Sequence, residues 1–276
     1  MKRLLSLLTI FTFSVIILPM LNCEKGETGA PQNFEIAANS TGDKVVLSWD
    51  EPSEGVPDEY VIYFDEGGTG TFDTVATTTD LEYTHDPAGK TGKYKVAAKL
   101  GDNEYFSEVL STIPIHTAVT TVYELEAAGN AGYGWDRTTF AGSTYSMASA
   151  SNASKVDFYI SNWFDDPQGG PWQTPYRIES PDEGPNDPGG VVPTGSWLQN
   201  RFTDPLTDPQ APLPVFSSTT YFNYTQITTD PTYIGVYTKA DGYYALVKFS
   251  GANATNGTIQ VETWFQSVKG LRLIAH

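Results

Sequence analysis

The sequence predicts an all-β fold, arranged as two β-sandwich-like domains in tandem. From residue 31 onward, short apolar segments with two-residue alternation recur along the chain, as they do in strands that bury one face. Turn-forming residues separate most of these segments, and the chain holds 25 Gly and 18 Pro. No window shows the periodicity of an amphipathic helix. The single cysteine excludes an internal disulfide, so packing alone must stabilise the sandwiches.

Residues 1–22 are predicted to be a lipoprotein signal peptide. Two basic residues precede an apolar run that ends at Leu21, which is the layout of a secretory signal. The tetrapeptide Met20–Cys23 resembles a bacterial lipobox, in which the signal peptidase cuts before the cysteine and the cysteine thiol carries diacylglycerol. Asn22 departs from the small residue that is usual at that position. An uncleaved membrane anchor and a plain secretory signal are the alternatives. The apolar run is at the lower limit of about 17 residues for a membrane span, and a lone free thiol is unusual in a secreted protein.

The segment 23–30 is predicted to be the lipidated cysteine and a short polar tether. The protein is then expected in the bacterial cell envelope, lipid-anchored at the outer membrane or the cell surface. The chain is acidic, with 33 Asp and Glu against 16 Lys and Arg and a formal net charge of −17. Nucleic acid is not expected as a partner, because phosphate binding requires clustered basic residues. The protein is expected to attach to the membrane only through its lipid. Cations and neutral sugars are compatible as ligands with the acidic surface.

Seven strand-like segments between residues 31 and 117 predict the first sandwich. Each is short, and turn residues separate most of them. In the second segment, Val45, Leu47 and Trp49 alternate onto one face. The segments are Phe34–Ala38, Lys44–Trp49, Glu59–Phe64, Phe72–Thr77, Leu81–Thr84, Gly92–Ala98 and Phe106–Thr112.

The segment 31–117 resembles a fibronectin type III module, which is an immunoglobulin-like sandwich. The resemblance implies that Trp49 fills the core and that Tyr94 forms the tyrosine corner, with its hydroxyl bonded to nearby backbone. The residues before Tyr94 depart from the usual Leu-x-Pro-Gly-x-x-Tyr segment. His85 lies in a predicted turn there, and we expect its side chain to be exposed and to serve no metal or proton site. Modules of this family are usually spacers or protein contacts. The residues that carry the resemblance are Pro31, Leu47-Ser-Trp49, Pro52, Tyr60-Val-Ile-Tyr63, Tyr94-Lys-Val-Ala-Ala98 and Ser107.

Residues 118–276 predict a second all-β domain, a sandwich or an open barrel, after a hinge at Ile113–Thr117. Its clearest unit is a hairpin around the Asn256-Gly257 turn, because asparagine and glycine tolerate the positive φ that a tight turn needs. The predicted strands are Val119–Leu125, Thr138–Met147, Lys155–Ile160, Tyr221–Ile227, Tyr233–Thr238, Tyr243–Phe249, Thr258–Phe265 and Leu271–Ala275.

The end of this domain resembles the ligand-binding β domains of haem-carrying bacterial surface lipoproteins. The resemblance implies haem capture by paired histidines. The sequence supplies one histidine in this domain, His276 at the terminus, and another at the hinge, His116. We therefore expect no haem.

A Pro/Gly-rich loop insert is predicted at 163–214, where about a third of the residues are proline or glycine. Its aromatic side chains argue against plain disorder, which is normally poor in them. In one interpretation, a proline-braced loop offers flat rings to a glycan or a protein. In the other, the rings pin the loop to its own domain. The ligand-binding candidates are Trp163, Trp172, Tyr176, Trp197, Asp165 and Asp166.

Metal and catalytic chemistry leave only weak signals in the sequence. Acidic pairs in the 163–214 loop could bind Ca²⁺ through oxygen atoms, although no calcium loop of EF-hand spacing is present. Zinc is not expected, because three histidines and one cysteine do not form the usual clusters. No nucleophile elbow and no phosphate-binding loop occurs, so we expect no catalytic residues. The calcium candidates are Asp165, Asp166, Asp182 and Glu183.

These observations predict a non-catalytic cell-envelope lipoprotein whose distal β domain recognises a glycan or a protein outside the cell. No cofactor is expected, apart from Ca²⁺ at the candidate positions. One alternative is a glycoside-active surface enzyme, since an acidic chain offers many carboxylate pairs. The other is a purely structural envelope protein with no ligand.

Overall fold

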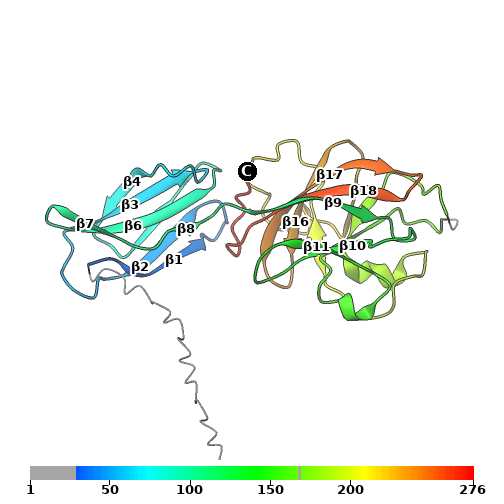
Figure 1. The fold of residues 1–276 in the computed structure, drawn as a ribbon, viewed down its shortest axis with the longest axis horizontal. Coiled ribbons are helices and arrows are strands. Elements are labelled where there is room, and N and C mark those ends of the chain that lie inside the picture. The colour runs from blue at the N-terminus through cyan, green and yellow to red at the C-terminus, as the bar shows by residue number, and fades with distance from the viewer. Residues whose placement is uncertain (1–28, 167–168) are drawn as a thin grey trace, which may run out of the picture.

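The computed structural model describes residues 29–166 and 169–276, which form eighteen strands and two short 3-10 helices. The signal peptide predicted at 1–22, the lipidation predicted at Cys23 and most of the tether lie outside the described residues. Within the described part, no helix is long and apolar enough to cross a membrane. Two β-sandwiches follow one another along the long axis of the molecule, so the predicted all-β fold class is confirmed (Figure 1).

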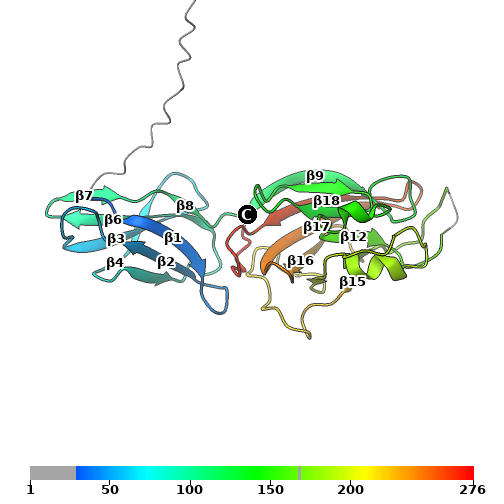
Figure 2. The ribbon, with the colours of Figure 1, turned by 90° about the horizontal axis from the view of Figure 1, so that it is seen from below.

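Two antiparallel sheets form the first domain, which has a fibronectin type III-like fold (Figures 1 and 2). One sheet has the order β1-β2-β5 and the other the order β4-β3-β6-β7, with β8 paired to β6. The predicted alternation is confirmed, because Val45 and Leu47 are fully buried and Trp49 is 3% exposed. The strand predicted at Phe106–Thr112 is instead split between β7 and β8. The strands are β1 (Gln32–Ala38), β2 (Val45–Asp50), β3 (Glu59–Glu66), β4 (Asp73–Thr78), β5 (Glu82–His85), β6 (Gly92–Leu100), β7 (Asn103–Phe106) and β8 (Leu110–Ser111).

Tyr94 fills the centre of this first core, but its hydroxyl meets a side chain and not the backbone. The hydroxyl oxygen lies 2.8 Å from Nδ1 of His85, and the His85 ring packs edge-on against Phe64. The expectation of an exposed turn histidine is therefore wrong, because β5 extends to His85 and carries its ring over the core. Burial of the imidazole lowers the pKa of His85.

Two five-stranded antiparallel sheets form the second domain. One has the order β11-β10-β12-β13-β15 and the other the order β14-β16-β17-β18-β9. The predicted hairpin turn is confirmed, with Gly257 at a φ of 61°. The residues expected to act as a hinge already belong in part to β9, which pairs with β18 from Ile115 onward. The strands are β9 (Ile115–Tyr123), β10 (Gly132–Trp135), β11 (Gly142–Tyr145), β12 (Phe158–Ser161), β13 (Arg177–Glu179), β14 (Asn200–Phe202), β15 (Tyr224–Gln226), β16 (Thr232–Thr238), β17 (Tyr243–Asn253) and β18 (Thr258–Phe265).

The space between these two sheets holds an aromatic core. Trp135 packs against Phe158 and Phe265, with ring centres 5.7 and 5.2 Å apart. The indole nitrogen of Trp135 and the hydroxyl of Tyr133 each lie 3.1 Å from the hydroxyl oxygen of Thr263. The polar atoms of these buried rings are thus hydrogen-bonded, as burial of a polar group requires.

Irregular segments cover the outer face of each sheet in the second domain. The segment 181–197 contributes Trp197 to an apolar cluster on Tyr159 of β12. The segment 206–221 contributes to a second cluster around Leu246 of β17. Both sheets are therefore buried on two sides over part of their length.

The region 163–214, which was expected to be a loop insert, contains regular structure. It holds β13, β14 and the 3-10 helix η2 (Pro181–Asn186), and a second 3-10 helix, η1 (Ala150–Asn152), precedes it. β13 pairs in one sheet and β14 in the other, so the region crosses between the two layers. The loop prediction is wrong there because strands of three residues produce no recognisable alternation.

The last residues do not form the strand predicted at Leu271–Ala275, and they lie between the two domains (Figure 1). Leu271 and Leu273 are fully buried in the core of the first domain. Ile274 packs into the cluster on β17 of the second domain. The apolar pattern that resembles a strand therefore arises because this segment contributes side chains to two domains.

Candidate functional site

Three adjoining clefts follow β15 and the residues on either side of it. They have volumes of about 290, 530 and 490 Å³, and we name them the Arg177 cleft, the edge cleft and the end cleft. Asn223 and Tyr224 line both the Arg177 cleft and the edge cleft, while Thr228 lines both the edge cleft and the end cleft. Sites for small ligands typically have volumes of about 300–1,000 Å³.

In the Arg177 cleft, a guanidinium group lies near two aromatic rings. The central guanidinium carbon of Arg177 is 4.5 Å from the ring centre of Tyr224 and 5.9 Å from that of Trp163. The Tyr224 side chain is 44% exposed, so ring surface remains open to solvent. The side-chain amide of Asn223 donates to Glu183 Oε1 at 2.8 Å on the wall of the same cleft. The cleft thus combines aromatic faces with both hydrogen-bond donors and hydrogen-bond acceptors.

Strand alternation places these side chains on the outer face of the sheet. In β13, Ile178 faces the core, so its neighbours Arg177 and Glu179 face outward. Trp163 has a φ of 64°, which is rare for a bulky residue, and its N–H donates to the Ser161 hydroxyl at 2.8 Å. A backbone held in such a conformation is common at ligand sites.

Two buried carboxyl groups lie beside this cleft. Glu179 is 1% exposed and Asp187 is 4% exposed, and the Tyr159 hydroxyl lies 3.4 and 3.3 Å from their respective oxygens. Burial raises the pKa of Glu179 to about 7, while the charge of Arg177 opposes that shift. Burial also raises the pKa of Asp187, although the Ser161 hydroxyl opposes it. Glu179 therefore titrates near neutral pH.

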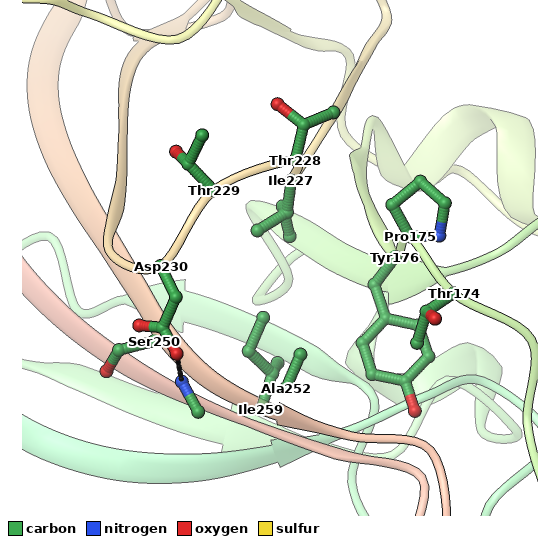
Figure 3. A pocket seen from close by; sticks show the side chains of 11 residues that line it. Thr174, Pro175, Tyr176, Ile227, Thr228, Thr229, Asp230, Ser250, Ala252 and Ile259 are labelled. Carbon is green, nitrogen blue, oxygen red and sulfur yellow. Dashed lines mark hydrogen bonds between the residues drawn. The ribbon is translucent and has the colours of Figure 1, made fainter.

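The end cleft opens between the segments 227–230 and 250–252 (Figure 3). Its apolar lining includes Tyr176, Ile227 and Ile259, which are buried residues of the core. The Asp230 carboxylate accepts a hydrogen bond from the Gly251 N–H at 3.0 Å and so joins the two segments. The cleft is thus a recess in the core with a polar rim.

Three carboxylates gather elsewhere in the second domain, at Glu124, Glu126 and Asp166. One oxygen of each lies within 4.8 Å of the others. The Glu126 N–H donates to Glu124 at 2.8 Å, and the Asp166 N–H donates to Glu126 at 2.6 Å. Burial raises the pKa of Glu124 to about 7 and also raises that of Glu126, and neighbouring carboxylates add to both shifts. This group could hold a hard cation such as Ca²⁺, because carboxylate oxygens are its preferred ligands.

The structure separates the aromatic residues that were predicted to bind a ligand. Trp163 lines the Arg177 cleft. Trp172, Tyr176 and Trp197 are 8%, 1% and 6% exposed and belong to apolar clusters of the second domain. The expectation that Trp172 and Trp197 face a ligand is wrong, because they pin the 163–214 region to its own domain, whereas Tyr176 belongs to the core and also lines the end cleft.

The acidic candidates also separate. Asp165 is exposed, whereas Asp166 is buried in the group of three carboxylates. Asp182 and Glu183 lie in η2, where Asp182 accepts a hydrogen bond from Ser180. Of the four calcium candidates, only Asp166 belongs to the one such group found among the described residues.

Sequence reasoning does not identify Arg177, Tyr224, Glu124 or Glu126 as site residues. A usable signal existed for Arg177, since it is one of two basic residues in an acidic stretch. No such signal exists for the two glutamates, because they lie about forty residues before Asp166 and meet it only in the folded protein.

Comparisons with known proteins concern the fold alone. No family model and no curated protein matches the chain. Among solved structures, the chain is similar to a DUF4466 family protein from Parabacteroides merdae, with 15% identity, a TM-score of 0.39 and coverage of 85% of this chain and 96% of that one. It is similar to a human fibronectin type III domain, with 18% identity, a TM-score of 0.27 and coverage of 31% and 77%. It is also similar to the FN5 domain of Drosophila Lar, with 19% identity, a TM-score of 0.25 and coverage of 31% and 96%. At these values the likenesses carry no argument about function.

Proposed function

We propose that this protein is a lipid-anchored, non-catalytic component of the bacterial cell envelope that recognises a glycan through the Arg177 cleft. Cys23 is the anchoring residue in this proposal, and the first domain is a spacer that holds the second domain away from the membrane. The observation that supports the proposal is the position of Arg177 beside the rings of Trp163 and Tyr224, next to amide and carboxylate groups.

A sugar ring matches such a cleft through two kinds of contact. Its C–H patches pack on aromatic faces, and its hydroxyls donate to carboxylates and accept from guanidinium and amide groups. Trp163 and Tyr224 supply the faces, while Arg177, Glu183 and Asn223 supply the polar groups. The aromatic contacts already restrain Arg177, so less side-chain freedom is lost when a ligand binds.

A glycan array tests this function with the full chain in detergent. The double variant Trp163→Ala, Tyr224→Ala should lose at least about ten-fold in affinity, which corresponds to roughly 1.4 kcal/mol. Phe164→Ala is the matched control, because Phe164 is 51% exposed beside Trp163 and does not line the cleft. Unchanged glycan binding by a folded double variant would overturn the proposal.

One observation favours glycoside hydrolysis as a second candidate function. Glu179 lines the Arg177 cleft and has a pKa of about 7, which suits a general acid at neutral pH. Asp187 provides a second carboxyl group close to the same tyrosine hydroxyl. Turnover on a polysaccharide panel that disappears in Glu179→Gln would support this candidate, and binding without turnover would exclude it.

A further inference from the structure

The backbone of β15 bonds to β13 through alternate residues. The Ser180 N–H donates to the Asn223 carbonyl at 2.8 Å, and the Ile227 N–H donates to the Tyr176 carbonyl at 2.8 Å. In an antiparallel pair, residues that exchange hydrogen bonds alternate with residues that do not. The odd-numbered residues from 223 to 227 therefore direct their backbone groups toward β13.

The even-numbered residues direct their backbone groups away from the sheet. Phe222 uses this outward side to exchange two backbone hydrogen bonds of 2.8 Å with Phe202. Tyr224 and Gln226 come next, and β15 is the last strand of its sheet. Two N–H groups and two carbonyl groups are thus presented on an open strand edge.

The edge cleft lies along this open edge. Its lining includes Thr225 as well as Tyr224 and Gln226, so the cleft follows the edge of the strand and not one face of the sheet. Asp204 and Pro205 contribute to the same lining from the segment that follows β14. Proteins usually protect an open edge with a short strand, lysine, proline or a bulge; β15 (Tyr-Thr-Gln) has only three residues, but it carries no lysine, proline or bulge.

We propose that the edge cleft binds an extended peptide segment of a partner protein, which adds to β15 as a further strand. Outward donors and acceptors that repeat every two residues, about 6.8 Å apart, match a peptide backbone and not a sugar chain. Asp204 lines the edge cleft and Asp230 lines the end cleft beside it, so the partner segment carries lysine or arginine near its ends. The inference goes beyond glycan recognition, because it uses the outward backbone groups of β15 and not the aromatic and polar side chains that form the Arg177 cleft.

A second copy of the chain fits this edge less well than a basic peptide. Pairing of two β15 edges would bring together two chains that each have a formal net charge of −17. It would also place the acidic residues of one copy close to those of the other. Like charges that face one another oppose association.

Peptide binding to the full chain in detergent tests the proposal. The probe is a fluorescent hexapeptide of alternating valine and threonine with an added lysine at each end. Gln226→Pro removes one outward N–H, and an edge strand tolerates proline when that N–H faces solvent. This variant should weaken peptide binding by about ten-fold or more, while Gln226→Ala should change it by less than about three-fold, since only the backbone is used.

The second arm changes the probe and not the protein. The same peptide with alternate backbone nitrogens methylated cannot pair with the edge and should not bind. Failure of the unmodified peptide to bind, or equal binding of the methylated one, would overturn the proposal. A concentration-dependent dimer that Gln226→Pro abolishes would overturn it in favour of self-pairing. Glycan binding is measured separately on the parent chain, and the methylated peptide changes no residue of the Arg177 cleft, so failure here is distinguishable from failure of the glycan function.

Discussion

Arg272 and Thr41 belong to opposite ends of the chain, yet the Arg272 guanidinium Nε donates to the Thr41 carbonyl at 2.6 Å. The backbone N–H of Arg272 also donates to the Gly42 carbonyl at 2.7 Å. The same side chain reaches the carbonyl of Leu213 in the second domain. One buried arginine therefore connects a loop of the first domain, the C-terminal segment and a loop of the second domain.

Arg272→Ala should destabilise the protein by roughly 2–4 kcal/mol, because hydrogen bonds of a charged donor contribute about 1.5–3 kcal/mol and their loss leaves carbonyl groups unsatisfied. Chemical denaturation measures the free energy of unfolding. Lys269→Ala is the matched control, since Lys269 is an exposed cation in the same segment. A loss no larger than that of the control would show that the interdomain connection does not depend on this residue.

Stability should fall as the pH rises from about 5 to about 8, because burial raises the folded-state pKa of Glu124 and of Glu179 to about 7 from the ordinary value of 4.5. Below about pH 4.5 both groups are protonated in the folded and unfolded states and contribute nothing. Between about pH 4.5 and pH 7, the two carboxyl groups ionise in the unfolded state but stay protonated in the folded state, and this difference favours unfolding. Each carboxyl then costs up to roughly 3 kcal/mol above pH 7, at about 1.4 kcal/mol per pKa unit.

Thermal melting of Glu124→Gln and Glu179→Gln across this pH range isolates the two contributions. Each variant should show a flatter pH dependence than the parent chain, because glutamine has the shape of the protonated group and does not titrate. An unchanged slope in both variants would show that other groups set the pH dependence.

The parts of the fold that sequence predicts are those with local signals. Val45, Leu47 and Trp49 alternate over a full strand, and Gly257 supplies the positive φ of a tight turn. The alternation of Leu271 and Leu273 is equally visible, but it reflects burial in another domain and not a strand. An apolar pattern in the sequence predicts that residues are buried, but it does not show which domain buries them or whether they form a strand.

The candidate site is harder to predict for a related reason. An aromatic residue such as Trp197 has the same identity whether it faces a ligand or its own core, and only packing distinguishes the two. The Arg177 cleft combines residues from three separate segments, around Trp163, Arg177 and Tyr224. Their proximity depends on the order of β12, β13 and β15 in the sheet, which the sequence does not reveal.

Trp197→Ala should destabilise the second domain by about 3–5 kcal/mol, the usual cost of removing a large buried aromatic side chain. Its indole N–H donates to the Pro193 carbonyl at 2.9 Å, and its ring is 6% exposed. Phe164→Ala, at an exposed position, should change the melting temperature little. A stable Trp197→Ala variant that loses ligand binding would contradict the placement of this ring in the core.

Ca²⁺ at millimolar concentration should raise the melting temperature more at pH 8 than at pH 5. The three carboxylates of Glu124, Glu126 and Asp166 repel one another when ionised, and a divalent cation would offset that repulsion. Asp166→Asn should remove the effect, while Asp165→Asn, at the exposed neighbouring position, should not. An equal rise in melting temperature in the parent chain and in Asp166→Asn would show that Ca²⁺ binds at a different site.

Cys23→Ala should release the folded protein from the membrane fraction. The anchor proposed here is a lipid on the Cys23 thiol, and the excess of 33 acidic over 16 basic residues disfavours attachment to anionic headgroups. Fractionation of cells that express the parent chain and the variant measures the distribution, and metabolic labelling with a fatty-acid analogue shows whether lipid is attached. Asn22→Ala places a small residue before the cysteine, and this variant should still incorporate the fatty-acid label and remain in the membrane fraction. Retention of unlabelled Cys23→Ala in the membrane would instead favour an uncleaved apolar segment as the anchor.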